Sequence, residues 1–274
     1  MKGGASGLGN GGIRPKWRNV RGITLEGILF WTLAGLAAVL VGMSKGGLPV
    51  VGMLGVPVLS QVISPVTAAG LLLPIYVVSD IFGLYAYRHR FNSRVLMIVG
   101  AGATAGIGLG WATASVVSEA LVTGVIGLIG AVFAVSILMK RDTAEGARPA
   151  RVGPGLLWGA VAGFTSFVSH SGAPPYQVYT LPLKLDKATF AGTATIAFAY
   201  INMVKLIPYY ALGQLNIENL KVAAILAVPS ALAVFLGVWL VKKLPEKLFF
   251  QLVTWALLAI SLRLIWQGAA SLMA

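Results

Sequence analysis

Long apolar runs constrain this chain more than any other feature of its sequence. Each of seven runs is long enough to cross the roughly 30 Å hydrocarbon layer of a membrane as a helix. They lie at residues 25–44, 66–87, 95–116, 119–139, 188–211, 220–241 and 245–267. Of the 274 residues, 57% are hydrophobic and only 11% are charged, a balance unlike that of soluble domains. The sequence therefore predicts an all-α polytopic membrane protein.

Three further apolar stretches are short or interrupted. Residues 155–170 are marginal in length for a span, and the stretches 48–63 and 173–183 contain prolines. Proline removes a backbone donor and breaks a helix. In hydrocarbon every backbone polar group needs a partner, so broken helices survive only where protein or a water-filled cavity surrounds them. We therefore expect the two proline-containing stretches to be half-helices in the interior.

The basic balance of the chain favours a membrane surface over nucleic acid as its partner. The net charge is +13, but lysine and arginine gather at the ends of the apolar runs and in short loops. In that position they set the orientation of the helices and contact anionic lipids. There are no cysteines and only two histidines, one in a basic loop and one in the apolar interior. The sequence thus offers no metal site and calls for no cofactor.

The polar residues of the broken segments recur in the second half of the chain. At a spacing of 125 residues, Ser44 matches Ser169, and several glycines and prolines match as well. At a spacing of 122, Asp80 matches Asn202 and Tyr87 matches Tyr209. The interpretation is an internal repeat, the common plan of secondary transporters. The predicted parts are a basic, glycine-rich arm (1–24), a first repeat (25–139), a cytoplasmic linker (140–153) and a second repeat (154–268).

Loop charges indicate that the two repeats are inverted. The loop at 87–94 is basic and its counterpart at 211–219 is not, whereas the loop at 116–120 lacks the three lysines of its counterpart at 242–247. The positive-inside rule then places the basic loops in the cytoplasm and the 118 loop outside. An inverted repeat needs an odd number of segments, so we predict about five helical segments in each half, with both termini outside.

Each half is expected to open with a helix, a bent tip and a short returning helix. Gly46 and Gly47 form the first tip, and Ser171 and Gly172 form the second. If the tips converge near the bilayer midplane, their helix N-termini present unpaired N–H groups and a partial positive charge. Such a site favours an anion.

Ionisable residues in the apolar interior point to the same region. Lys45 and His170 occupy equivalent positions at the two tips, and Lys205 lies one turn beyond Asn202. Interior charges cost about 2.5 to 3.5 kcal/mol each on insertion scales, so they generally have a partner or a function. Asp80 is either a structural partner of Lys45 or Lys205, or a carboxylate that carries protons or orients substrate. Lys45 could also be a lysine that reaches toward the interface.

Two other patterns favour structural roles. Tyr87 and Tyr209 end apolar runs and are typical of the aromatic belt at the membrane interface. Gly102, Gly106 and Gly110 fall on one helix face and predict close packing of another helix.

The two tips resemble those of the sulfite exporter TauE/SafE family. The resemblance rests on "GMSKGGLPVVGMLGVPVL" from Gly42 and "FVSHSGAPPYQVYTLPL" from Phe167, each followed by an Ala-Gly pair that begins a long helix. It implies export of a small sulfur-containing anion, sulfite or an organosulfonate, through a central site. The implied site residues are Ser44, Lys45, Gly46, Gly47, Asp80, Ser169, His170, Ser171, Gly172 and Asn202, to which the interior charge adds Lys205. The second tip is less glycine-rich than the family pattern.

The resulting hypothesis is a secondary transporter, not an enzyme, in a bacterial inner membrane, working by alternating access. An anion channel is the alternative, and a membrane enzyme is a weaker one because Ser169, His170 and Asp80 are the only candidate catalytic set. Protons are a permitted coupling ion, and the oligomeric state stays open.

Overall fold

The computed structural model describes residues 25–116, 118–139 and 146–273, and their regular secondary structure is entirely helical. Eight helices in these ranges are long and apolar enough to cross a membrane. They are α1 (Leu25–Lys45), α4 (Pro65–Tyr87), α5 (Ser93–Ala112), α6 (Glu119–Met139), α7 (Val152–Ser169), α9 (Lys187–Ala211), α10 (Ile217–Lys243) and α11 (Glu246–Met273). The predicted polytopic all-α class is confirmed. The predicted arm (1–24) and residues 140–145 of the linker lie outside the described residues.

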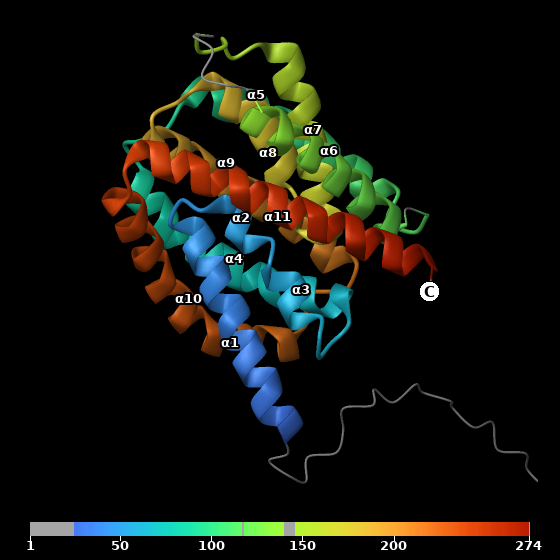
Figure 1. Ribbon diagram of the computed structural model, residues 1–274. Coiled ribbons are helices and arrows are strands. Elements are labelled where there is room, and N and C mark those ends of the chain that lie inside the picture. The colour runs from blue at the N-terminus through green and yellow to red at the C-terminus, as the bar shows by residue number, and fades with distance from the viewer. Residues whose placement is uncertain (1–24, 117, 140–145, 274) are drawn as a thin grey trace, which may run out of the picture.

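The two proline-containing stretches form short helices, as the sequence predicts. The first becomes α2 (Pro49–Gly52) and α3 (Gly55–Leu59), and the second becomes α8 (Ala173–Thr180) and a single 3-10 turn, η1 (Leu181–Leu183). Along the chain each lies between two long helices of its own half, and in Figure 1 α2 and α3 lie beside α1. α7 begins at Val152, at the end of the predicted linker.

Side-chain caps fix where several long helices begin. Ser64, Asn92, Asp186 and Asn216 each accept a hydrogen bond from a backbone N–H in the first turn of the helix that follows. At Asp186, outside the membrane-spanning part of α9, hydrogen bonds from the Thr189 side chain and from the first-turn amides hold the pKa of the carboxyl below its usual value. These caps satisfy the otherwise unpaired N–H groups of the helix starts.

The two halves of the chain are intertwined. The most extensive helix pairings join one half to the other: α5 with α7, α6 with α11, α1 with α10, and α4 with α9 and α10. In Figure 1, α1, α4 and α10 gather on one side of the bundle, α5 and α7 on the other, and α11 crosses in front of both groups. Neither half therefore has a core of its own, although the inverted relation between them stays a prediction.

Glycines allow two of these pairs to approach backbone to backbone. A Cβ atom added at Gly102 or Gly106 of α5 would lie 2.3 or 1.9 Å from a carbonyl oxygen of α7. Gly42 of α1 lies equally close to the carbonyl of Ser230 on α10. The predicted packing role of the α5 glycines is confirmed. In each pair, residue numbers rise together along both helices, so the paired helices run parallel.

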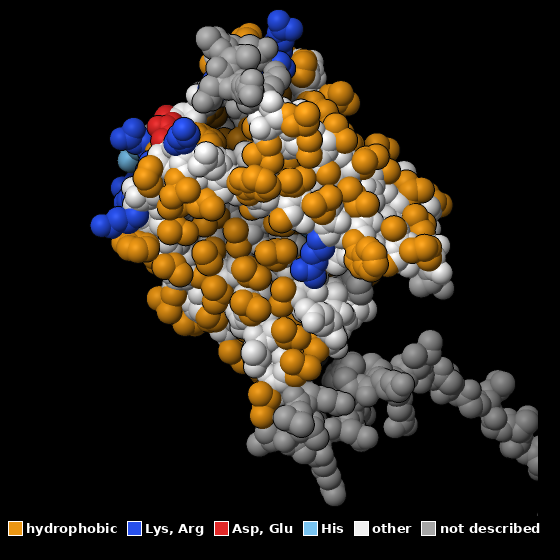
Figure 2. Space-filling view, in the orientation of Figure 1, with side chains coloured by type: hydrophobic (Ala, Val, Ile, Leu, Met, Phe, Trp, Pro, Cys, Tyr) orange, Lys and Arg blue, Asp and Glu red, His pale blue; other side chains and the backbone are white. Residues whose placement is uncertain are grey.

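The basic loops lie together at one end of the bundle. Arg94 donates to the Ala150 carbonyl at 3.1 Å, and Lys187 donates to the Lys242 carbonyl at 3.3 Å. The Asn92 N–H donates to Thr193 near the start of α9 at 2.9 Å, so these four regions lie together. Figure 2 shows Lys and Arg side chains concentrated at this end and apolar side chains over the body. The arrangement is the one that the positive-inside rule requires, with the basic end as the predicted cytoplasmic side.

Replacing Gly106 by alanine should destabilise the bundle, because the new methyl group would collide with the Ala160 backbone. Overpacking of this kind costs about 1 to 3 kcal/mol. The matched control is Gly108→Ala two residues away, where an added Cβ meets nothing within 4 Å. Thermal unfolding in nanodiscs should show a lower midpoint for Gly106→Ala only. Equal midpoints for the two variants would contradict the α5–α7 packing.

Candidate functional site

A small cavity lies where the two tips, α4 and α9 come together. Its volume is about 30 Å³, two to three times the roughly 10 to 15 Å³ that one water molecule needs. The walls consist of Ser44, Lys45, Pro49, Gly52, Met53, Tyr76, Ser166, His170, Ala173, Ala194, Thr195, Phe198 and Asn202. We call this space the central cavity.

The first tip is held by its backbone. α1 ends at Lys45, and Gly47 then takes a φ of +108°, a conformation that favours glycine. The carbonyl of Gly46 accepts a hydrogen bond of 2.6 Å from the Tyr87 hydroxyl, and the carbonyl of Lys45 accepts one of 3.2 Å from Thr195. A Cβ atom at Gly46 would lie 2.5 Å from the Val234 carbonyl oxygen. The tip therefore needs these two glycines for packing and turning.

The second tip turns at a histidine. His170 caps α7 with a φ of +55° and a ψ of +21°, the left-handed region that non-glycine residues rarely adopt. The Tyr209 hydroxyl donates to the Phe167 carbonyl at 2.9 Å, which ties the end of α7 to α9.

The two tyrosines at the tips are not interface residues, and that expectation was wrong. Tyr87 and Tyr209 are 5% and 2% exposed, and each hydroxyl donates to a carbonyl at a tip. Burial of a tyrosine usually requires a partner for its hydroxyl, and a free carbonyl at a helix end provides one. Their position at the end of an apolar run is equally typical of both roles, so sequence alone did not separate them.

A buried ion pair links the first tip to the middle of the bundle. Lys45 Nζ lies 2.7 Å from Asp80 Oδ1, and both side chains are almost fully buried. The other carboxylate oxygen accepts a hydrogen bond of 2.8 Å from Asn202 Nδ2. Of the two partners left open for Asp80, the structure shows Lys45. Asp80 itself lies behind the cavity wall, whereas Lys45 and Asn202 line it.

A second buried cation supports the opposite wall of the cavity. Lys205 Nζ donates to the carbonyl and the hydroxyl of Ser166 and to His170 Nδ1, each at 3.1 Å. The hydrogen-bond pattern assigns the histidine tautomer. Nδ1 accepts from the ammonium, so Nε2 carries the proton and donates to the Tyr209 oxygen at 3.3 Å.

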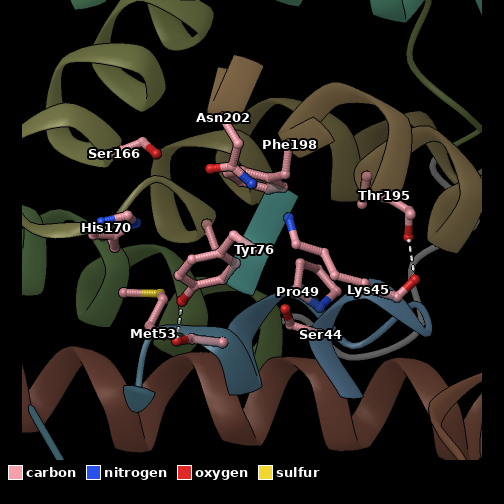
Figure 3. Close-up of a pocket in the computed structure, with 13 residues that line it drawn as sticks. Ser44, Lys45, Pro49, Met53, Tyr76, Ser166, His170, Thr195, Phe198 and Asn202 are labelled. Atoms are coloured by element: carbon pink, nitrogen blue, oxygen red, sulfur yellow. Dashed lines mark hydrogen bonds between the residues drawn. The ribbon is translucent and has the colours of Figure 1, made fainter. Parts of the chain in front are cut away.

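The Tyr76 side chain lies between Lys45 of the first tip and His170 of the second. Figure 3 shows its ring between His170 and Lys45, and its hydroxyl donates to the Gly52 carbonyl at 2.7 Å. His170 stacks on the ring at 5.1 Å between centroids, and Lys45 Nζ lies 5.0 Å from the ring centroid. The negative face of an aromatic ring stabilises a nearby cation.

Both tips line the central cavity, but they contact α9 at different levels. The first tip contacts α9 at Thr195, and the second contacts it at Lys205, ten residues or about 15 Å further along the helix. The cavity lies between these two levels. Helix N-termini also contribute less than expected, because Pro174 and Pro175 remove two of the first three N–H groups of α8. Side chains supply most of the polar character.

The remaining predicted residues differ in their positions. Ser44 lines the central cavity, Gly46 and Gly47 pack the first tip, and Gly172 packs against α7 and α9. Ser169 and Ser171 face a different, larger space. Sequence reasoning missed Tyr76, Ser166, Thr195 and Phe198. Ser166 lies one turn before His170 and Thr195 lies two turns before Asn202, so helical spacing from the chosen residues would have found both.

Comparison with known proteins decides the family. The family model described as "Sulfite exporter TauE/SafE" matches residues 28–264. The chain belongs to this family. No curated protein and no solved structure matches it. Sulfite exporters are membrane transporters, so the protein is a multi-pass membrane transporter and not an enzyme. Within the described ranges no cluster of histidine and acidic side chains could hold a metal ion.

Replacing Asp80 by asparagine should destabilise this TauE/SafE protein, because the variant leaves a buried Lys45 ammonium without a counter-charge. Breaking a buried pair in this way costs about 3 to 5 kcal/mol. The double variant Asp80→Asn with Lys45→Met should recover part of that loss. Thermal unfolding of Asp80→Asn, Lys45→Met and the double variant measures the coupling, and additive losses would mean that the pair contributes nothing.

The left-handed turn at His170 can be tested separately from its ring. His170→Gly and His170→Ala both remove the imidazole, but only glycine adopts this conformation without strain. The glycine variant should therefore be more stable than the alanine variant by about 1 to 2 kcal/mol. Chemical or thermal unfolding of the two variants provides the comparison, and equal stability would contradict the turn geometry.

Proposed function

We propose that this protein exports a small sulfur oxyanion, with sulfite as the expected substrate, by alternating access around the central cavity. The family supports a sulfite exporter. The bundle supplies an internal cavity beside the short helices of both halves, and long helices from both halves present polar side chains to it. Many secondary transporters bind substrate at such a place.

The observation that carries this proposal is the buried amine of Lys205, which has no carboxylate within ion-pair distance among the described residues. Its side chain is fully buried, and its hydrogen-bond partners are a carbonyl, a hydroxyl and an imidazole. The carboxylate of Asp80 is already occupied by Lys45 and Asn202. A buried ammonium without a counter-charge is costly, and an anion in the adjoining cavity would offset that cost.

The cavity wall also keeps hydrogen-bond donors available for an oxyanion. Lys45 has three N–H donors and uses one on Asp80, and Asn202 has a second amide N–H. Ser166 Oγ accepts from Lys205, so its own hydrogen can point into the cavity. Three donors around a space of about 30 Å³ suit the three oxygens of sulfite better than a bulkier organosulfonate.

Membrane potential supplies a driving force in the predicted orientation. Export of an anion from an interior-negative cell is electrically favourable by about 2.3 kcal/mol per charge at a membrane potential of 100 mV. Proton coupling is therefore permitted and not required. In the proposed orientation the basic loops face the cytoplasm across a bacterial inner membrane. Export then runs toward the opposite end of the bundle, where the loop at residue 118 lies.

An anion channel is the second candidate, because a central cavity with cationic walls suits conduction as well. A transporter that closes around its substrate gives saturable flux, whereas an open pore gives flux proportional to concentration. Sulfite efflux measured over a wide concentration range separates the two.

Lys205→Met should weaken sulfite transport while the protein stays folded. Lys205 lies behind the cavity wall at Ser166 and His170, so its ammonium would attract a bound anion through the interior without a direct hydrogen bond. Loss of about 1.4 kcal/mol of this attraction should raise the sulfite concentration at half-maximal flux about tenfold. The measurement is uptake of labelled sulfite into proteoliposomes with the potential clamped at both signs.

The matched control is Lys247→Met, which removes the same charge from an exposed position at the basic end. It should transport like the unmodified protein. Unchanged half-saturation in Lys205→Met would remove this lysine from the site, and absence of sulfite flux in the unmodified protein would overturn the proposed function.

A further inference from the structure

A second and larger cavity adjoins the central one. It has a volume of about 480 Å³, and its walls come from α3, the beginning of α6, the end of α11 and the second tip. The lining side chains are Val56, Pro57, Ser60, Ala120, Thr123, Ser169, Ser171, Leu264, Trp266, Gln267, Ala270 and Ser271. α11 begins near the basic loops, so its far end, and this cavity with it, lies toward the opposite end of the bundle.

One turn of the chain separates the two cavities. His170 lines the central cavity, whereas its neighbours Ser169 and Ser171 line the larger one. The two serines mainly bond within the tip: Ser169 Oγ donates to Ser171 Oγ at 3.0 Å, and Ser171 Oγ donates to the Ser169 carbonyl at 3.2 Å. The partition is therefore a single turn, with a residue in the left-handed conformation at its centre.

We propose that the larger cavity is a water-filled outer vestibule that binds the departing sulfur oxyanion through neutral hydroxyl and amide donors, with the turn from Ser169 to Ser171 as its gate. This inference rests on the proposed export of a sulfur oxyanion. It adds a second binding site, a direction of release and the segment that must move.

The chemistry of the walls fits a site of release. Half of the twelve lining residues are polar, and none is lysine or arginine. The hydroxyl group of Thr123 and the amide of Gln267 can donate hydrogen bonds to sulfonate or sulfite oxygens without carrying a full charge. Hydrogen bonds from neutral donors are roughly half as strong as those from an ammonium. An anion held loosely here can leave for bulk water.

Cysteine labelling tests the vestibule, since the natural chain has no cysteine. Thr123→Cys places a thiol in the vestibule wall. In right-side-out vesicles it should react with a membrane-impermeant anionic thiosulfonate reagent added outside. Ethanesulfonate at high concentration should slow the reaction severalfold relative to chloride at equal ionic strength. The attached sulfonate should reduce sulfite efflux at least fivefold.

Three control thiols calibrate the experiment. Ser118→Cys lies exposed on the 118 loop and should react from outside without protection by ethanesulfonate. Ser93→Cys lies exposed at the basic end and should react only from inside. Thr254→Cys is buried on α11 away from both cavities and should stay unmodified.

The outcomes separate this inference from the proposed function. If Thr123→Cys transports sulfite but reacts only with a membrane-permeant apolar maleimide, the cavity is lipid-filled and the vestibule proposal is wrong. Reaction from outside without protection by ethanesulfonate would overturn the binding site. Absence of sulfite flux in the unmodified protein would instead overturn the exporter itself, whatever the labelling shows.

Discussion

The interior of this protein depends on the ion pair between Lys45 and Asp80. Each charge alone would be costly inside a membrane, and together they become tolerable because the contact is short and the second carboxylate oxygen is also satisfied. The pair joins the end of α1 to the middle of α4, and Asn202 extends it to α9 in the other half. These contacts hold the first tip in place, and Ser44 and Lys45 of this tip form part of the wall of the central cavity.

Residues that the predicted repeat places in equivalent positions meet or make similar contacts in the interior. Asn202 donates to Asp80, and Lys45 and His170 lie on either side of Tyr76. Tyr87 and Tyr209 each donate to a carbonyl at the tip of their own half. These contacts are what a duplicated framework would produce. The charges themselves are not symmetric, because Lys205 has no carboxylate within ion-pair distance among the described residues, and the proposed anion site rests on this asymmetry.

Sequence could predict the class and much of the site, because the membrane imposes strong rules. The lengths of the apolar runs located the long helices. The need for every backbone polar group to be hydrogen-bonded in the membrane explained why the stretches at Pro49 and Pro174 form short helices in the interior. Lys45, Asp80 and Lys205 could be selected because ionisable residues are rare inside membrane helices. The choice between Lys45 and Lys205 as the partner of Asp80 could not be made, since it depends on how far α1 extends before it turns.

Other features depend on packing that periodicity does not encode. The two tips pass at different levels of α9 because α1 and α7 follow different partner helices, α10 and α5. Tyr76 appeared as one apolar residue among many in α4, and only the stacking of His170 shows its role. The vestibule combines residues from four distant segments, so no local pattern pointed to it.

The most direct test of the central claim is a structure determined with bound selenite, an oxyanion of the same shape as sulfite whose selenium atom is readily located by anomalous scattering. The account predicts a selenium atom in the central cavity, with its oxygens within hydrogen-bond distance of Lys45, Ser166 and Asn202. Selenium at saturating selenite found only outside this cavity, or no bound selenium at all, would contradict it.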